Sequence, residues 1–291
     1  MTNILLTGIA TLDIINQLPS YPAEDSEVRA TAQHIQTGGN ASNTAIVMQQ
    51  LGLNTHLFAS RADDINAQQI FSSLNAQHVN TEFCNTQKNS ATPTSYITLN
   101  TSNGSRSIVH YRDLAELQAC DFFALNLDNI NWFHFEARAC EQLELMLKHA
   151  TTFKKPISIE LEKDREGIND IMQYADVLFI SKPFALSRGF KHASECLQHF
   201  AKRFPAAIIT CTWGNQGAWL AHQSLIIHQP VIQIHKVCET LGAGDTFNAG
   251  FIASLIKNKN TQQALMFACK LAAQKCAQFG FSHLSIPDIN T

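Results

Sequence analysis

The sequence lacks the signatures of several common protein classes. Its eight cysteines form no C-x-x-C pair, which argues against a zinc ribbon or a thioredoxin-type redox site. No basic run is longer than Lys154-Lys155 or Lys202-Arg203, and the net charge is −3, so we expect neither nucleic acid nor a membrane as a partner. No apolar stretch approaches the roughly 20 residues that are needed to span a bilayer.

Two familiar nucleotide-binding motifs are also missing. The chain contains no Gly-Lys dipeptide, which excludes the P-loop, and no G-x-G-x-x-G follows the first predicted strand, which disfavours a nicotinamide dehydrogenase. The stretch MTNILLTGIATLDII has no cationic region and reaches Asp13 early, so it does not resemble a secretory signal. Because the cysteines mostly have apolar neighbours, we expect reduced core thiols and a cytoplasmic protein.

The composition is that of a chain that can bury a large core. Hydrophobic residues make up 45% of the 291 residues and charged residues only 15%, which suits one large α/β domain. Strands are predicted at residues 3–9, 55–60, 131–136, 156–162, 176–181 and 206–212. Helices are predicted at residues 41–51, 65–78, 139–150, 165–174, 191–204, 243–256 and 261–278. This alternation predicts a mainly parallel sheet covered by helices on both faces.

Two β-rich segments interrupt the alternation. Residues 13–36 are polar and end in a strand-like pattern, whereas residues 94–112 predict a hairpin around the turn Asn103-Gly104. We expect the two segments to form a small sheet that stands off the main one. Its apolar face would need cover from the body, the substrate or a second subunit. Hairpin-like strands are also expected at residues 217–222, 225–227 and 231–237.

Polar residues and glycines follow the predicted strands, at the edge where parallel sheets bind ligands. These residues are Asp13, Glu136, Arg138, Glu160, Glu162, Gly214 and Gly217. A few polar residues are expected there simply as helix caps, so one such residue alone decides nothing. The motif Gly38-Gly39-Asn40 opens the first long helix, where Asn40 or Ser42 caps the free N–H groups or, alternatively, Asn40 and Asn43 bind sugar hydroxyls through their amides.

The stretch TLGAGDTFNAG, residues 240–250, carries a sharper signal. Free N–H groups and the helix dipole make a helix N-terminus an anion site, and Gly242 and Gly244 let a phosphate approach the backbone. A carboxylate at the same end, Asp245, would accept a proton from an attacking hydroxyl. A plain N-cap explains the aspartate but not the two glycines.

The two motifs GGNASN and ETLGAGDTFNAG, in this order, resemble the paired signatures of the PfkB (ribokinase-like) family of carbohydrate kinases. The stretches YPAEDSEVRA, NGSRSIVHY, WFHFEAR and ELEKDRE narrow the resemblance to the branch that phosphorylates ketohexoses. The resemblance covers nearly the whole chain. It implies a three-layer α/β/α sandwich with a mainly parallel central sheet, in one kinase domain over residues 1–291. It also implies a small β-sheet lid, formed by residues of about 13–36 and 94–112.

The resemblance assigns roles to the residues that match the family. It implies Asp245 as the general base, Gly242, Ala243 and Gly244 as the anion hole, and Arg106 as a ligand of the transferring phosphate. It implies sugar contacts from Asp13, Asp25, Gly39, Asn40 and Asn43, with Glu136 and Arg138 as further candidates. It places adenosine against Trp213, Gly214, Gly217, Ala273 and Cys276. The implied partners are a small-molecule sugar, ATP, and a second copy of the chain bound through the lid.

Two departures from the family pattern bear on the metal ions. ATP and Mg²⁺ are the implied cofactors, but the family's N-x-x-E motif is replaced by ISKPFA, so Glu160 or Glu162 would hold Mg²⁺ through water. The loop of Glu239 and Thr240 corresponds to a monovalent-cation site in many relatives, where the first residue is usually Asp. Glu239 therefore leaves dependence on K⁺ open.

The leading hypothesis is an ATP-dependent kinase of a primary sugar hydroxyl, the C1 hydroxyl of a fructose-like ketohexose. Alternatives within the family are kinases of ribose, of a nucleoside or of a ketodeoxy sugar acid, whose carboxylate would need a cation such as Arg29 or Arg138. A catalytically silent carbohydrate-binding regulator is a third possibility, because a fold does not fix a function. His134 and His235 have no metal spacing and are interpreted as structural.

Overall fold

The computed structural model describes residues 2–223, 225–282 and 284. Strand β1 (Asn3–Gly8) lies inside the main sheet, and its side chains alternate between two hydrophobic cores. Ile4 and Leu6 pack into one core and Leu5 into the other, all without solvent exposure. A near-continuous apolar run is what a parallel strand needs when helices cover both of its faces.

The main sheet contains nine strands over the described residues, and most of its pairs are parallel. Its strands are, in spatial order, β13 (Leu225–Gln229), β12 (Ala218–His222), β11 (Ile208–Thr212), β10 (Val177–Ile180), β9 (Ile157–Leu161), β8 (Trp132–Glu136), β1, β4 (Asn54–Arg61) and β5 (Asn85–Thr86). Within the described sheet only the pairs β11–β12 and β12–β13 are antiparallel, so β12 alone runs against the other strands. The parallel strands therefore end together at one edge.

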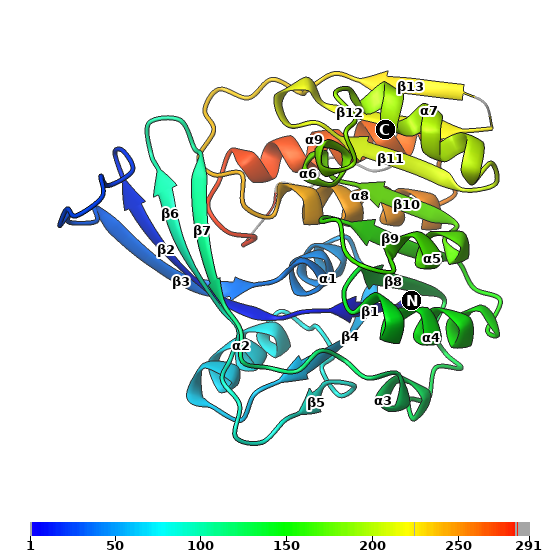
Figure 1. The fold of residues 1–291 in the computed structure, drawn as a ribbon, viewed down its shortest axis with the longest axis horizontal. Helices are drawn as coiled ribbons and strands as arrows, with labels where there is room; N and C mark the ends of the chain where they lie inside the picture. Colours follow the sequence, from blue (N-terminus) through cyan, green and yellow to red (C-terminus); the bar gives the residue numbers. More distant parts are fainter. Residues whose placement is uncertain (1, 224, 283, 285–291) are drawn as a thin grey trace.

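Helices cover both faces of this sheet (Figure 1). One layer contains α1 (Asn40–Gln50), α2 (Ile65–Ala76), α8 (Ala243–Ile256) and α9 (Thr261–Cys276). The other contains α3 (Ala119–Phe123), α4 (Cys140–Thr151), α5 (Ile168–Ile171), the 3₁₀ turn η1 (Met172–Tyr174), α6 (Lys182–Ser187) and α7 (Ala193–Arg203). A further 3₁₀ turn, η2 (Gly214–Gln216), precedes β12. The molecule is thus a three-layer α/β/α sandwich.

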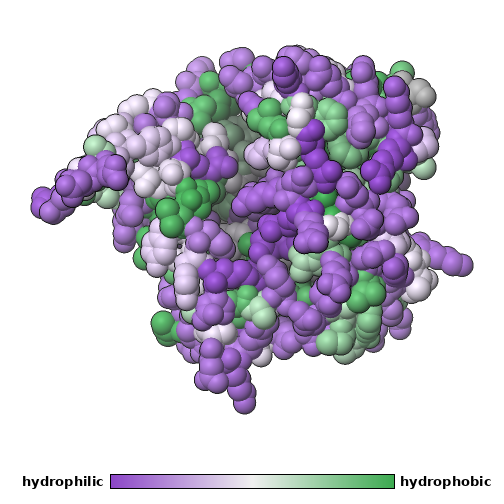
Figure 2. Space-filling view, in the orientation of Figure 1, coloured by the Kyte–Doolittle hydropathy of each residue, from purple (hydrophilic) through white to green (hydrophobic). Residues whose placement is uncertain are grey.

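A second, four-stranded sheet stands off one side of the sandwich (Figure 1). We call it the small sheet; its spatial order is β3 (Ala32–Gly38), β2 (Thr11–Leu18), β6 (Thr94–Asn100) and β7 (Arg106–Tyr111). Each of the two β-rich segments of the sequence supplies two neighbouring strands. The space-filling view shows a hollow between the small sheet and the body (Figure 2).

Most predicted elements are confirmed within two or three residues, but two are not. The strand predicted at residues 231–237 is wrong, because the described chain has no strand between β13 and α8. Pro230 cannot donate a ladder hydrogen bond, and both Val231 and Val237 are exposed. The helix predicted at residues 165–174 shrinks to α5 and η1, because Gly167 lies in the left-handed region with φ +74°.

Candidate active site

Asp245 lies in the first turn of α8, directly opposite α1. The amide Nδ2 of Asn43 donates a hydrogen bond of 2.7 Å to Oδ2 of Asp245, and both side chains are buried. This bond joins the two sequence motifs across 202 residues of chain. Packing of α1 on α8 therefore brings the predicted sugar-binding amide and the predicted base together.

The environment of Asp245 makes its carboxyl group a much weaker acid than that of an exposed aspartate. Burial raises the pKa of Asp245 to about 8, and the carboxylates of Glu162 and Glu136 act in the same direction. The hydrogen bond from Asn43 and the charge of Arg106 oppose this rise in pKa. A carboxylate whose pKa lies near neutral pH is well matched to accept a proton from an alcohol.

Two glycines let backbone approach the site closely. Gly242 is the N-cap of α8 with φ +74°, and a Cβ there would come within 2.1 Å of the Phe281 ring. A Cβ on Gly38 would come within 2.0 Å of the carboxylate of Asp13. The first N–H groups of α8 have no partner inside the helix, and its dipole favours an anion there. The turn thus offers an anion site beside Asp245.

The small sheet contacts this turn directly. Arg106, the first residue of β7, donates from Nη1 to the hydroxyl of Thr240 at 2.6 Å. Leu241 packs against a small apolar cluster of the sheet that includes Ile15 and Ile97. The exposed Arg106 guanidinium is therefore held beside the anion site, which suits a ligand of phosphate oxygens.

Three glutamates at the strand ends interact electrostatically with Asp245. Glu136 ends β8, Glu160 lies in β9, and Glu162 follows it. Burial raises the pKa of Glu136, and burial together with the neighbouring Asp245 raises that of Glu160 well above its ordinary value. A side-chain hydrogen bond from Asn40 acts against the rise at Glu160. The sequence prediction that these carboxylates meet at one sheet edge is confirmed.

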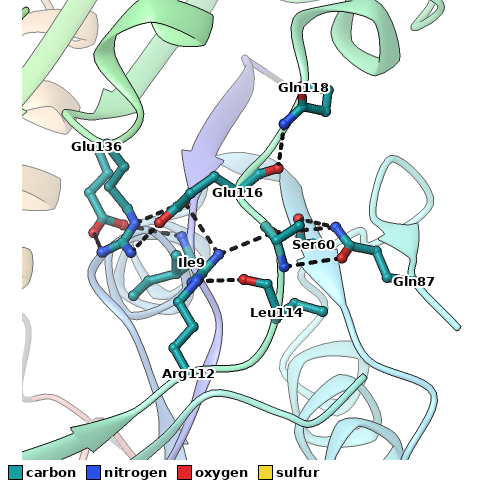
Figure 3. A network of polar contacts seen from close by, with 10 residues as sticks. Ile9, Ser60, Gln87, Arg112, Leu114, Glu116, Gln118 and Glu136 are labelled. Carbon is teal, nitrogen blue, oxygen red and sulfur yellow. Dashed lines mark hydrogen bonds and ion pairs between the residues drawn. The ribbon is translucent and has the colours of Figure 1, made fainter. Parts of the chain in front are cut away.

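Glu136 and Arg138 belong to a polar network that also includes Glu116, which no sequence motif indicates; Figure 3 shows Glu136 and Glu116 within it. Arg138 lies 2.6 Å from Oε1 of Glu116 and 3.5 Å from Oε1 of Glu136, whose Oε2 accepts from the N–H of Ile9 at 3.1 Å. Arg112 adds a second guanidinium, 3.2 Å from Glu116. Glu116 lies on a loop without secondary structure, where no sequence pattern indicates its role.

The other predicted sugar-binding residues are not all together. Asp13 is a buried residue of β2 that accepts a hydrogen bond from Thr11 at 2.9 Å, and burial raises its pKa. Gly39, with φ +97°, caps α1 and accepts at its carbonyl from the N–H of Asn43. Asp25 lies exposed in the turn between β2 and β3, and no hydrogen bond joins it to the others within the described chain.

The residues predicted to bind adenosine come from two adjoining elements. Trp213 and Gly214 open the turn η2, and Gly217 follows it with φ +89°. Ala273 and Cys276 lie near the end of α9, which packs against β12 and β13. Trp213 is buried, with the Lys182 ammonium 5.5 Å from its ring centroid. Burial raises the pKa of Cys276, so this thiol is a neutral packing group.

Three further predictions concern metal ions, histidine and membranes. The described residues contain no group of three or more His, Cys, Asp or Glu side chains that could hold a metal ion. His134 is buried, its Nδ1 pairs with Ser158 at 2.9 Å, and burial lowers its pKa to about 3, so it is a neutral core residue.

Within the described chain, no helix has the length and apolar character that crossing a membrane requires.

This arrangement defines a class of protein. A mainly parallel sheet between helix layers, a small sheet over its edge, and a carboxylate at a glycine-rich helix N-terminus are features of ribokinase-like phosphotransferases. Residues 1–289 match the sequence family described as pfkB family carbohydrate kinase. The chain belongs to this family, as its two motifs predict, and is an ATP-dependent carbohydrate kinase.

Individual relatives agree with this assignment. The chain is 36% identical to ketohexokinase from Mus musculus, over 96% of this chain and 97% of that protein. It is 26% identical to ribokinase from Bacillus subtilis, over 96% and 94% of the two chains. The solved structure of Arabidopsis thaliana ribokinase complexed with ribose and ATP superposes with a TM-score of 0.80 at 22% identity, covering 96% of this chain and 93% of that one. The ribokinase-like fold class predicted from the sequence is confirmed.

Proposed function

We propose that this kinase transfers the γ-phosphoryl group of ATP to the C1 hydroxyl of a fructose-like ketohexose, with Asp245 as the general base. The preference for a ketohexose rests on the 36% identity to mouse ketohexokinase, which exceeds the 26% identity to the bacterial ribokinase. The observation that carries the chemistry is the Asp245 carboxylate, buried at the N-terminus of α8 with a pKa of about 8.

The base acts on the attacking hydroxyl, whereas the anion hole acts on the phosphoryl group that is transferred. Asp245 accepts the proton of the attacking hydroxyl, while the N–H groups at Gly242, Ala243 and Gly244 stabilise the charge that develops on the transferred group. Arg106, held by Thr240, binds oxygens of the same group in its planar fork. Positioning and charge stabilisation supply most of the catalysis in phosphoryl transfer.

The sugar lies between α1 and the small sheet in this proposal. Oδ1 of Asn43 is buried without a hydrogen-bond partner in the described chain, which supports a role as acceptor for a sugar hydroxyl. Asp13, Gly39 and Asn40 line the same region, with Asp25 proposed from the small sheet. A sugar acid is less well supported, because Arg138 is already paired with Glu116 and Glu136.

Magnesium would accompany ATP. Glu160 and Glu162 would hold its water ligands, and the buried Oε2 of Glu160, which has no partner in the described chain, supports this. The ion would neutralise charge on the β- and γ-phosphates. Adenosine would lie against Trp213, Gly214, Gly217, Ala273 and Cys276.

We also propose that residues 1–291 work as one kinase unit in which the small sheet is a lid. A lid over the hollow of Figure 2 keeps water from the γ-phosphate and so limits hydrolysis of ATP. The eight cysteines are free thiols, four of them buried, which supports a reducing cytoplasmic location.

The small sheet also supports the proposed homodimer. Ile35, Ile14, Tyr96 and Val109 are paired in register across all four strands, so they share one face as a continuous apolar row. Three of them are strongly exposed, Val109 by 69%. An exposed apolar row of this kind needs a partner surface, and a second copy of the sheet offers a matching one.

The dimer is tested by the oligomeric state in solution. Val109→Asp places a charge in the apolar row, so we expect light scattering after gel filtration to report a monomer in place of a dimer. Leu145→Asp, at an exposed apolar position on α4 in the helix layer packed on the main sheet, is the matched control and should leave the dimer intact. A monomeric wild-type protein would contradict this part of the proposal.

The substrate is tested by ADP formation across a panel of fructose, ribose, a nucleoside and a ketodeoxy sugar acid. We expect the highest kcat/KM for fructose, with the phosphate on C1 by NMR of the product. A clear preference for another acceptor would overturn the ketohexose assignment. Tight sugar binding without any ADP formation would favour a silent regulator.

A further inference from the structure

Lys275, near the end of α9, is a fully buried lysine whose charge is matched by a single carboxylate. Its Nζ lies 2.6 Å from Oε1 of Glu239, and the two side chains are 0% and 2% exposed. The same Oε1 accepts from the N–H of Gly280 at 2.7 Å. A buried ion pair is a poor source of stability compared with apolar packing, so a role in position is the better explanation for its presence.

The pair clamps the chain segment that leads into the proposed anion hole. The N–H groups of Cys238 and Glu239 both donate to the carbonyl of Cys276, at 2.8 and 3.4 Å. The end of α9 thus holds this segment through the backbone and, at the neighbouring Lys275, through a side chain. The next residue, Thr240, is the one that receives the hydrogen bond of Arg106.

The clamp also extends to the glycine that begins α8. Nζ of Lys275 lies 5.1 Å from the ring centroid of Phe281. The same ring closely approaches Gly242, where a Cβ would come within 2.1 Å of it. Lys275, Phe281 and Gly242 therefore form a continuous stack behind the proposed anion hole, and a shift of the lysine would be passed to the turn.

These contacts disagree with a bound K⁺ at Glu239, the site that the family resemblance suggests. The carboxylate of Glu239 already has an ammonium group at 2.6 Å and an N–H at 2.7 Å. Both contacts are to Oε1, and a second cation at this carboxylate would be repelled by the ammonium at short range in a buried environment. The carbonyl of Cys276, another candidate oxygen, is occupied by two N–H donors.

We propose that Lys275 is a positioning residue that holds the Glu239–Thr240 segment in place of a bound monovalent cation, so that phosphoryl transfer does not require K⁺. The inference rests on the proposed function, because the segment matters through the anion hole at Gly242–Gly244. In this proposal K⁺ is not a cofactor, and Lys275, 36 positions from Glu239 in the sequence, holds the turn in position.

The test measures kcat, KM and melting temperature in KCl, NH₄Cl, ethylammonium chloride and choline chloride at equal ionic strength. The wild type should have the same kcat in all four salts. Lys275→Ala should lose roughly 10-fold or more in kcat through misplacement of the turn. Ammonium or ethylammonium should restore part of that kcat by replacing the lost group. Lys270→Ala, at an exposed position on the same helix, is the control and should behave as the wild type.

Three outcomes decide against the inference. They are a K⁺ requirement of the wild type, a folded Lys275→Ala with wild-type kcat, and a reduced kcat that no amine restores. If Lys275→Ala does not fold, the double variant Glu239→Gln/Lys275→Met is used in its place. It removes both members of the ion pair and so leaves no unpaired buried charge. We expect this double variant to fold with a lower kcat, an unchanged sugar KM and no response to any of the salts; wild-type kcat would overturn the proposal.

A protein that is not a sugar kinase would be distinguished from one that needs K⁺. A wild type that phosphorylates no sugar would refute that function, and the cation question would then be decided by melting temperature. A bound cation stabilises the folded state by mass action. A higher melting temperature of the wild type in KCl than in choline chloride would contradict the inference, and equal melting temperatures would support it.

Discussion

The pH dependence of the kinase follows from the environment of Asp245. Burial raises the pKa of this carboxyl from 3.8 to about 8. Only the deprotonated form accepts a proton from the sugar, so kcat/KM should rise with pH and level off above 8. At pH 6 the reactive fraction is about one hundredth, so kcat/KM should lie about 100-fold below its plateau.

The measurement is the sugar kcat/KM from pH 5.5 to 10, with melting temperatures recorded at each pH to exclude unfolding. Glu162→Gln removes a negative charge that raises the pKa of Asp245, so the acid limb of this variant should move to lower pH. Any direct effect of Glu162 on Mg·ATP would lower the plateau without moving the limb. A profile that is flat between pH 6 and 9 would show that no carboxyl group with a pKa near 8 acts as the base.

Two further predictions concern stability. Because the folded-state pKa of Asp245 lies above the unfolded value, the wild type loses stability as pH rises from about 4 to about 8. Asp245→Asn should therefore melt several degrees above the wild type at pH 9 but not at pH 4, as thermal scans would show; equal curves would contradict a buried charge. Gly242→Ala should lose at least about 1 kcal/mol through its positive φ and the Phe281 contact, whereas Gly244→Ala, with open space around it, should not. Urea titrations would measure the difference, and equal losses would be evidence against the strain at Gly242.

The sequence predicts best those helices and strands whose start, end and apolar positions are all marked within one segment. Helix α8 has its glycines, its aspartate and its apolar run within one segment, and its predicted bounds agree with the structure. Residues 231–237 show the limit of such patterns. Their alternation resembles a strand, but no neighbouring strand pairs with them in the described chain. Pairing is a property of the whole sheet, which a local pattern does not contain.

The residues of the site also fall into two groups, those within recognisable motifs and those outside them. Asp245 and Asn43 lie in the two motifs, and the packing of α1 on α8 brings them into contact. Glu116 and Lys275 were missed because each acts through a partner distant in sequence, Arg138 and Glu239 respectively. Lys275 in particular is one of two lysines in α9, and the sequence does not distinguish it from the exposed Lys270.

The role of Asp245 as the base is tested by fructose-dependent ADP formation by the wild type and by Asp245→Asn, both shown to be folded by thermal scans. We expect turnover by the wild type and a loss of roughly 10²-fold or more in kcat in the variant, the scale of a lost general base. Near-wild-type phosphorylation by Asp245→Asn would contradict the assignment of Asp245 as the base.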